Sequence, residues 1–523
     1  MSGTGLRNGW AFAVPDDVAA DDRYSLGIGP FGSNLKVNDY TDTGVPLVFV
    51  RHIRAELFDG HDSHFISEKK AKELRAHEVH PGDVLITKMG DPPGDVTLYP
   101  RSRPVGIITA DCIKWRINPS AGLPEYFAYA TRTASVQRQI LRITKGVAQR
   151  KISLARFRSI EYPVAPLPEQ HRIVEAIESY FTRLDDAVAT LERVQRNLKR
   201  YRASVLKAAV EGRLVPTEAE LARAEGRDYE PASVLLERIL AERHRRWQEA
   251  GSRSKYQEPA APDTSDLLDL PEGWCWVSLG QLLREPLING RSVPDARGGF
   301  PVLRLTSLKG DQIDLAERKM GHWTVDEARA FLVSRGDFLV ARGNGSIRLV
   351  GRGGLVTIDP DPVAFPDTLI RVRVDAMHFS PHLLAVLWNS PLVRLHIERR
   401  AKTTAGIHKV NQADLELTPI PLPPRAEQER LLAELDRCFS VGDETYGTVA
   451  TQQRRCIRLR QSILKWAFEG KLADQDPSDE PAGALLERIR SQTSANRQTA
   501  SDADDRRRRR SGRRSSVRTE NKP

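Results

Sequence analysis

The chain has 523 residues, of which 40% are hydrophobic and 28% charged, and its formal net charge is +10. This length allows three or four domains, and the composition is that of an ordinary globular protein. The four cysteines form no CxxC pair and have no zinc-site spacing, so neither disulfides nor a structural zinc are expected. We find no apolar N-terminal segment and no apolar run of 18 residues, which predicts a cytoplasmic protein without a membrane span.

Residues 1–165 and 271–420 are predicted to form two related α/β domains, because short β-like runs and turn residues recur in the same order. Gly9-Trp10 near the start of the first stretch parallels Gly273-Trp274 in the second. The run PGDVLITK, which ends at Lys88, parallels RGDFLVAR, which ends at Arg342. In both, a Gly-Asp turn is expected to precede a buried strand that ends in a cation.

A long helix is predicted after the first domain, within residues 166–250. Between Ile173 and Val205, apolar residues recur in alternating steps of four and three, which is the spacing of a coiled-coil seam. The helix is expected from Gln170 to Leu214, and at 1.5 Å per residue it would span roughly 68 Å. A helix of this length with one apolar stripe requires a partner helix.

The partner is predicted to be a second copy of the same helix, within residues 421–492. LKAAVEGRL (206–214) returns as LKWAFEGKL (464–472), and Glu169-Gln170 returns as Glu427-Gln428 at the same offset of 258. Gly442, Gly447 and Gln452 weaken the middle of the second seam, where a bend or loose packing is expected. The residues assigned to helix pairing are Ile173, Ile177, Leu184, Leu191, Leu198, Leu431, Leu435, Leu459 and Ile463.

Each long helix is followed by a short second helix that begins after a repeated Glu-Pro-Ala (230–232 and 480–482). Residues 251–270 are predicted to be a linker. The tail, residues 493–523, is predicted to be disordered, and its arginine-rich end accounts for half of the net charge. Any contact of this tail with DNA phosphates is expected to be nonspecific.

DNA contacts are predicted from polar and cationic residues in or beside loops of the two domains. Arginine, asparagine and glutamine can hydrogen-bond base edges, whereas lysine mostly contacts phosphate. The candidates are Lys88, Arg142, Lys145, Gln149, Arg150 and Lys151 in the first domain and Arg342, Asn344, Arg348, Lys402, His408 and Lys409 in the second.

Four motifs suggest catalysis or cofactor binding but have simpler structural interpretations. Asp91-Pro92-Pro93-Gly94 resembles an amino-methyltransferase loop, yet it lacks the aromatic fourth residue and is better read as a turn. Gly27-x-Gly29-x-x-Gly32 contains Pro30 and follows no strong strand, so no dinucleotide site is expected. The His61-x-x-His64 and Glu68-Lys69-Lys70 motifs are assigned to a surface loop and a surface helix, and no catalytic or metal site is predicted.

The tandem domains, the Gly-Trp openings, the PLP…EQ entries into the long helices and the EGRL/EGKL exits resemble the specificity subunit of Type I restriction-modification systems. The resemblance covers roughly residues 8 to 490. It implies an α+β fold in which two globular α/β target-recognition domains are separated by two long antiparallel coiled-coil helices, as a pseudo-twofold tandem repeat. Each domain would then read one half of a bipartite DNA site, and the helices would set the spacing between the halves.

The resemblance further implies a subunit without catalytic activity of its own. Two methyltransferase subunits and the restriction (translocase and nuclease) subunits would bind to it, and they would hold S-adenosylmethionine, ATP and magnesium. Two alternatives remain open at this point. A single-chain DNA methyltransferase would transfer methyl groups without partners, and a coiled-coil scaffold that binds only proteins would not shift bipartite duplex DNA in a gel.

Overall fold

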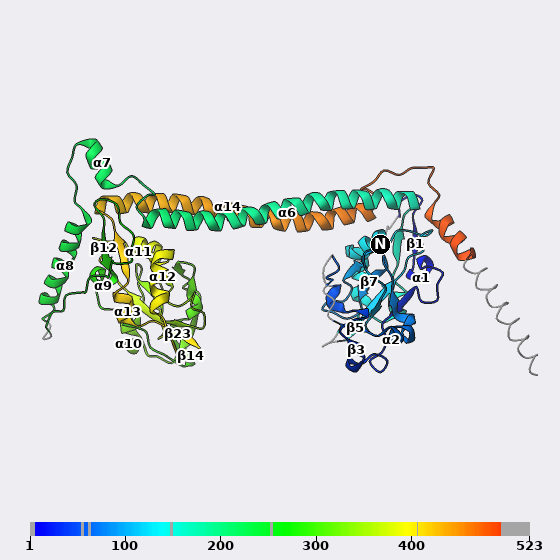
Figure 1. The fold of residues 1–523 in the computed structure, drawn as a ribbon, viewed down its shortest axis with the longest axis horizontal. Helices are drawn as coiled ribbons and strands as arrows, with labels where there is room; N and C mark the ends of the chain where they lie inside the picture. Colours follow the sequence, from blue (N-terminus) through cyan, green and yellow to red (C-terminus); the bar gives the residue numbers. More distant parts are fainter. Residues whose placement is uncertain are drawn as a thin grey trace, which may run out of the picture. The chain divides into compact units, whose positions relative to one another are not determined.

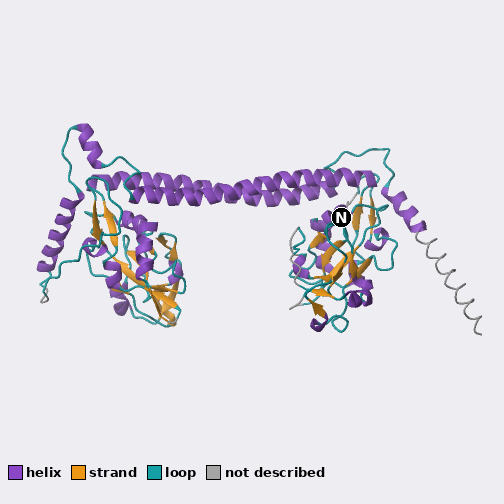
Figure 2. Ribbon diagram, viewed as in Figure 1, coloured by secondary structure: helices purple, strands orange, loops and turns teal. Residues whose placement is uncertain are grey.

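The computed structural model describes residues 6–53, 57–60, 64–146, 150–251, 255–404 and 406–492, so the basic tail lies outside the described residues. The chain divides into unit 1, residues 1–191 with 451–523, and unit 2, residues 192–450. Each unit contains one domain that mixes helices and strands, together with part of each of the two longest helices (Figure 1, Figure 2).

The first domain, in unit 1, is built from two sheets and a terminal strand pair. Its strands are β1 (Ala11–Ala13), β2 (Leu26–Ile28), β3 (Tyr40–Thr41), β4 (Val45–Val48), β5 (Phe65–Ile66), β6 (Glu78–Val79), β7 (Val84–Thr87), β8 (Val96–Leu98), β9 (Gly106–Ile108), β10 (Cys112–Trp115) and β11 (Tyr162–Val164). One sheet has the order β2-β10-β7-β8 and the other the order β3-β5-β4-β9-β6. Strands β1 and β11 pair antiparallel, so the two ends of the domain meet.

Helices cover these sheets and connect their strands. They are α1 (Pro15–Val18), α2 (Glu68–Glu73), α3 (Pro124–Arg132), α4 (Ala134–Ile143), α5 (Leu154–Phe157) and the 3-10 turns Val37–Asp39, Val50–His52 and Arg75–His77. Helix α3 begins with proline, which suits the first turn because no backbone N–H is needed there. Helix α4 follows at once, and the Thr133 side chain caps it by accepting from the Val136 N–H.

The second domain, in unit 2, repeats this plan with additions. Its strands are β12 (Cys275–Ser278), β13 (Ile288–Asn289), β14 (Asp295–Leu303), β15 (Leu308–Lys309), β16 (Gln312–Ile313), β17 (Arg318–Gly321), β18 (Phe338–Ala341), β19 (Gly343–Asn344), β20 (Gly353–Leu355), β21 (Leu369–Val372), β22 (Lys402–Thr404), β23 (Ile407–Lys409) and β24 (Pro419–Leu422). Its helices are α9 (Leu279–Leu282), α10 (Val325–Ala328), α11 (Pro381–Trp388), α12 (Pro391–Arg400), α13 (Gln412–Glu416) and the 3-10 turns Leu305–Ser307 and Arg329–Phe331. The main sheet has the order β13-β21-β18-β20-β16-β15, and β12 pairs with β24 as β1 pairs with β11.

The two domains share a four-stranded core. The order β2-β10-β7-β8 corresponds to β13-β21-β18-β20, with the fully buried strands β7 and β18 in equivalent places. The Gly-Asp turn before each of these strands is held by an ion pair: Asp83, 2% exposed, bonds Arg116 Nε at 2.9 Å, and Asp337, also 2% exposed, bonds Arg373 Nε at 2.5 Å. Both aspartates also accept a backbone N–H three residues earlier in the chain. The predicted Gly-Asp turns therefore precede buried strands in both domains.

The Gly-Trp openings are joined to the long helices by a buried hydrogen bond. Trp10 Nε1 donates to Glu169 Oε2 at 3.1 Å in unit 1, and Trp274 Nε1 donates to Glu427 Oε1 at 2.9 Å in unit 2. Burial raises the pKa of both glutamates. The Gly-Trp opening and the start of the long helix are distant in the sequence, and the same hydrogen bond links them in both units.

The two longest helices are α6 (Leu167–Val210) and α14 (Arg425–Phe468), and each is continuous through 44 residues. Helix α6 begins three residues earlier than expected, with Pro168 in its first turn, where proline is tolerated, and it ends at Val210 rather than at Leu214. Gly212 and Gly470, at φ 64° and 68°, follow their ends. No helix within the described residues has the length and apolar character needed to cross a membrane.

The seam residues near the domains are the most buried. Ile173, Ile177, Leu431 and Leu435 are completely buried and Ile463 is 8% exposed, because they contact a domain core as well as the other helix. Leu184, Leu191 and Leu198 are half-buried. Leu459, by contrast, is 40% exposed, and Cys456 and Ile463 supply the buried side chains in that stretch.

The same cross-helix contact occurs in both units at an offset of 258. In unit 1, Arg460 of α14 pairs with Asp185 of α6 and lies 4.7 Å from the Phe181 ring centre. In unit 2, Arg202 of α6 pairs with Asp443 of α14 at 3.5 Å and lies 4.2 Å from the Phe439 ring centre. Near the helix starts, Arg172 pairs with Asp479 at 2.6 Å, and Arg430 pairs with Glu218 at 2.6 Å. Within each unit the two helices therefore run in opposite directions.

The segment that follows each long helix packs against the domain of the other repeat. Beyond α7 (Glu218–Glu225), helix α8 (Ala232–Glu249) begins with the Ala232 N–H donating to the Gly273 carbonyl oxygen at 2.7 Å. In unit 1, a helix over residues 482–492 begins with the Ala482 N–H donating to the Gly9 carbonyl oxygen at 2.8 Å. Helix α8 is longer than the sequence pattern indicated, and its Arg246 pairs with Asp375 of the second domain at 2.5 Å.

Lys114 of β10 is a buried cation whose titration can be measured. It is 1% exposed, its Nζ donates to the carbonyl oxygen of Glu78, and burial lowers its pKa from 10.5 to about 8. Between these values the unfolded chain binds more protons than the folded chain, so stability rises with pH. From pH 7 to pH 9.5 the first domain should gain about 2 kcal/mol relative to a Lys114→Met variant.

Urea unfolding at pH 7 and pH 9.5 checks this expectation. Pulse-labelled hydrogen exchange of peptides from β7 and β10 reports the free energy of unfolding of the first domain at each pH. The equivalent cation of the second domain, Arg371, remains charged at pH 9.5, so peptides from β18 and β21 serve as the internal control. An equal difference between wild type and variant at the two pH values would contradict the assignment.

Candidate nucleic-acid interface

In the first domain, the cation that follows the central strand lies beside a basic hairpin. Lys88 follows β7, and its carbonyl oxygen accepts from the Ile152 N–H at 2.9 Å. Lys145 and Lys151 pair across the hairpin through backbone hydrogen bonds of 3.1 and 2.9 Å, and Met89 forms a β-bridge with Lys151. The residues brought together here are called the first basic site: Lys88, Lys145, Arg150 and Lys151.

The first basic site carries more cations than carboxylates. Lys145, Arg150 and Lys151 are exposed, whereas Lys88 is half-buried and its Nζ donates to the Ala110 carbonyl oxygen at 3.0 Å. Arg150 pairs with Asp91 at 3.2 Å. The surplus of positive charge favours an anionic partner.

The other two candidates of the first domain are placed differently. Arg142 lies exposed in the last turn of α4, just ahead of Lys145. Gln149 lies outside the described residues. Both remain predictions.

The second domain forms an equivalent site. Arg342 follows β18, and its carbonyl oxygen accepts from the Val410 N–H at 3.0 Å, as that of Lys88 accepts from Ile152. Strands β19, β23 and β22 then pair side by side, so that Asn344 lies opposite His408, and Lys409 opposite Lys402. The second basic site consists of Arg342, Asn344, Lys402, His408 and Lys409.

Side-chain contacts within the second basic site limit which atoms can face a ligand. Asn344 Oδ1 accepts from the Ser346 N–H at 3.0 Å, which leaves both amide N–H donors and one lone pair of the oxygen for a base contact. His408 Nδ1 lies 3.0 Å from Thr403 Oγ1. Thr403 was not predicted from the sequence, because only its pairing with His408 places it here. Arg348 is exposed in the loop between β18 and β20.

Comparison with known proteins shows what the chain is similar to. A family model described as the Type I restriction modification DNA specificity domain matches residues 51–194, which include the first basic site and the start of α6. The chain is 25% identical over 508 residues to the Type I restriction enzyme EcoKI specificity subunit of Escherichia coli (strain K12), covering 95% of this chain and 98% of that relative. It is 24% identical over 498 residues to the StySPI specificity subunit of Salmonella potsdam, covering 93% and 96%. Over nearly its whole length, the chain is thus similar to Type I restriction-modification specificity subunits.

Two solved structures show the same fold. The HsdS subunit from Thermoanaerobacter tengcongensis aligns with a TM-score of 0.50 at 18% identity, over 90% of this chain and 99% of that chain. A chain from a structure on complex assembly and conformational transition of the type I R-M system aligns with a TM-score of 0.54 at 20% identity, over 89% and 99%. The predicted fold class, α/β domains with two long paired helices, is confirmed.

The Asp91-Pro92-Pro93-Gly94 segment is part of the loop between β7 and β8. The Gly94 N–H donates to the carbonyl oxygen of Thr87 at 3.0 Å, and Asp91 is engaged by Arg150. Gly94 has φ 105°, and a Cβ placed on it would lie 2.8 Å from Ile140 Cγ2. An aromatic side chain, as a methyltransferase loop requires there, does not fit without displacing α4.

The remaining motifs have structural roles where they are described. Gly27 lies in β2, which pairs with β10 and does not lead into an α-helix. Lys69 and Lys70 lie in α2, which Ser67 caps. His61 lies outside the described residues, and the ring of His64 packs edge-on against Tyr40 at 5.1 Å.

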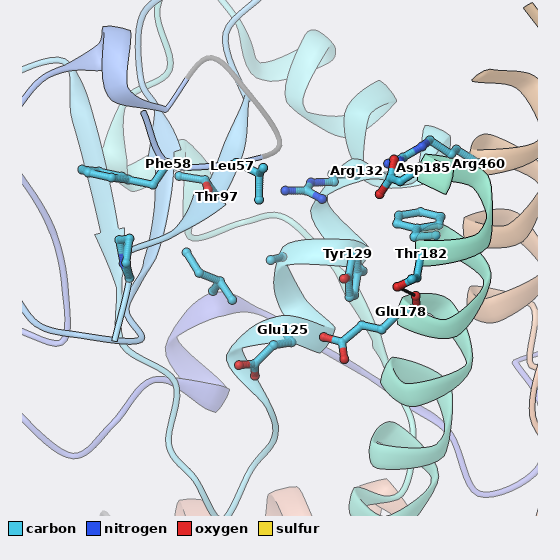
Figure 3. Close-up of a pocket in the computed structure, with 14 residues that line it drawn as sticks. Leu57, Phe58, Thr97, Glu125, Tyr129, Arg132, Glu178, Thr182, Asp185 and Arg460 are labelled. Carbon is cyan, nitrogen blue, oxygen red and sulfur yellow. Dashed lines mark hydrogen bonds and ion pairs between the residues drawn. The ribbon is translucent and has the colours of Figure 1, made fainter. Parts of the chain in front are cut away.

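A pocket of about 1010 Å³ in unit 1 has a different character from the basic sites (Figure 3). Helix α3, strand β8 and the two long helices contribute to its lining, and Glu125 and Glu178 face it. Burial, and then the proximity of Glu125, raise the pKa of Glu178. Its acidic edge is unsuited to phosphate, and the candidate DNA-contacting residues do not line it.

Proposed function

We propose that this chain selects the DNA sequence for a Type I restriction-modification complex and has no catalytic activity of its own. Each domain would read one half of a bipartite site in double-stranded DNA. The observation that carries the proposal is the recurrence of one arrangement, a cation at the end of the central strand beside a basic hairpin, in both domains.

The two basic sites suit DNA because they combine two kinds of donor. Lysines such as Lys145 and Lys151 would contact phosphates and fix the position of the domain on the duplex. Arginine and asparagine, such as Arg150 and Asn344, can donate to base edges in the major groove. Since equivalent positions hold different residues, for example Lys88 and Arg342, the two domains would read different half-sites.

The partners in this proposal are two methyltransferase subunits and the restriction subunits, which would hold S-adenosylmethionine, ATP and magnesium. Exposed apolar side chains on α14 support a protein-binding role for the long helices: Ile457 is 66% exposed and Trp466 54%. These partners supply the chemistry, and this chain supplies the choice of sequence.

Methylated adenines, mapped in cells that express the methyltransferase subunits with or without this chain, test the proposal. A bipartite methylated sequence that appears only with the chain is expected. Replacing residues 1–165 with the corresponding domain of another family member should change one half-site and leave the other intact. A change in both halves would contradict separate reading, and methylation by the purified chain alone would support a single-chain methyltransferase.

A further inference from the structure

In the first domain, the loop that follows Lys88 is anchored on helix α4. The loop joins β7 to β8, and at its far end the Gly94 carbonyl oxygen accepts from Gln137 Nε2 at 3.1 Å. Ile140 of the same helix lies directly against Gly94, where an added Cβ would be 2.8 Å from its Cγ2. Helix α4 therefore holds the loop end through one hydrogen bond and one close apolar contact.

The second domain anchors its equivalent loop in the same place. The Gly351 N–H donates to the Ala341 carbonyl oxygen at 2.8 Å, as the Gly94 N–H does to Thr87. Gly351 has φ 67°, and an added Cβ would lie 2.3 Å from Ile397 Cγ2 of α12. The Gly351 carbonyl oxygen accepts from Trp388 Nε1 at 2.8 Å.

A second polar contact to this loop comes from Arg394, which stands in α12 where Gln137 stands in α4. Gln137 and Ile140 correspond to Arg394 and Ile397, with the same spacing along the helix. Arg394 Nη2 lies 3.5 Å from the carbonyl oxygen of Arg348, inside the loop that carries the predicted DNA contacts, and 3.1 Å from Glu398 Oε1 of its own helix. Arg394 is 8% exposed, and its buried Nη1 has no hydrogen-bond partner among the described residues. A buried guanidinium that is only partly paired costs stability, so packing alone does not explain it.

We infer that Gln137 and Arg394 are positioning residues for base selection, each setting the conformation of the loop that follows the central strand of its own domain. The inference rests on the proposed function. A side chain that reads bases must be held within about half an ångström of its productive position, and a loop without its anchor samples other conformations. Loss of the anchor should therefore reduce discrimination between bases more than it reduces phosphate-driven affinity.

The test uses the chain assembled with its methyltransferase subunits and measures Kd for the recognised duplex and for duplexes with one base pair changed in one half-site. Gln137→Leu should lower discrimination in the half-site of the first domain by about three- to tenfold, the equivalent of one hydrogen bond. Discrimination in the other half-site should not change. Arg394→Met should lower discrimination in the half-site of the second domain and leave that of the first domain unchanged. Gln137→Glu keeps the side-chain length but loses the amide donor, so it should behave as Gln137→Leu does.

The matched control is Gln139→Leu. Gln139 lies on the same helix, and its Nε2 donates to the Glu161 carbonyl oxygen at 2.9 Å, away from the loop. It should lower the melting temperature as Gln137→Leu does but leave both discrimination ratios unchanged. Equal ratios in the Gln137 variants and wild type, or a loss in both half-sites together, would overturn the inference. A wild-type complex that discriminates at neither half-site would instead refute the proposed function.

Discussion

Replacing the four cations of the first basic site with alanine is expected to weaken binding of the assembled complex to its recognition duplex by roughly a thousandfold. Four contacts at about 1 kcal/mol each account for this factor. Because each of the three lysine–phosphate contacts releases counterions, the slope of log K against log salt should also fall by about three. Titrations at several salt concentrations measure both quantities.

The control for this experiment removes the same charge elsewhere in the first domain. It replaces four exposed cations outside the site, Lys36, Lys69, Lys72 and Arg75. This variant should retain most of the affinity, because a charge distant from the phosphates is screened by salt. If both variants lose affinity equally, net charge rather than a localised site governs binding.

Asp83→Ala is expected to destabilise the first domain by about 3 kcal/mol or more. The variant removes a buried carboxylate that makes two bonds to Arg116, at 2.9 and 3.1 Å, and it also removes the acceptor for the His80 N–H. Removing one partner of a buried ion pair costs about 3–5 kcal/mol, because the other charge stays in a poorly solvated place. Urea unfolding, followed by hydrogen exchange of peptides from β7, measures the change.

Asp22→Ala provides the comparison, because it removes a second carboxylate from the same arginine. Asp22 pairs with Arg116 at 3.2 Å, but its side chain is 47% exposed. An exposed pair contributes about 1 kcal/mol at most, so this variant should unfold nearly as wild type does. If Asp22→Ala and Asp83→Ala were equally damaging, burial would not be the reason that the Gly-Asp turn is stable.

The long helices could be predicted because their signal is local. Alternating steps of four and three report one face of a helix, and the repeat at an offset of 258 reports two copies. The cations at the ends of β7 and β18 were predictable for the same reason, since each follows a buried strand directly. The exposure of Leu459 was not, because the seam pattern does not show which positions the partner helix covers.

By itself, the sequence determined the two-copy organisation, the long helices and the basic residues that follow the central strands, since each depends on neighbours along the chain. The tertiary structure decided what each of these touches. Ile152 joins Lys88, and Val410 joins Arg342, only when the strands pair, and Gln137 meets Gly94 only when α4 packs on the loop. The helix over residues 482–492, which follows α14, packs against the first domain rather than the second, because the long helices run in opposite directions within each unit. Such contacts join residues far apart in sequence, and no local spacing encodes them.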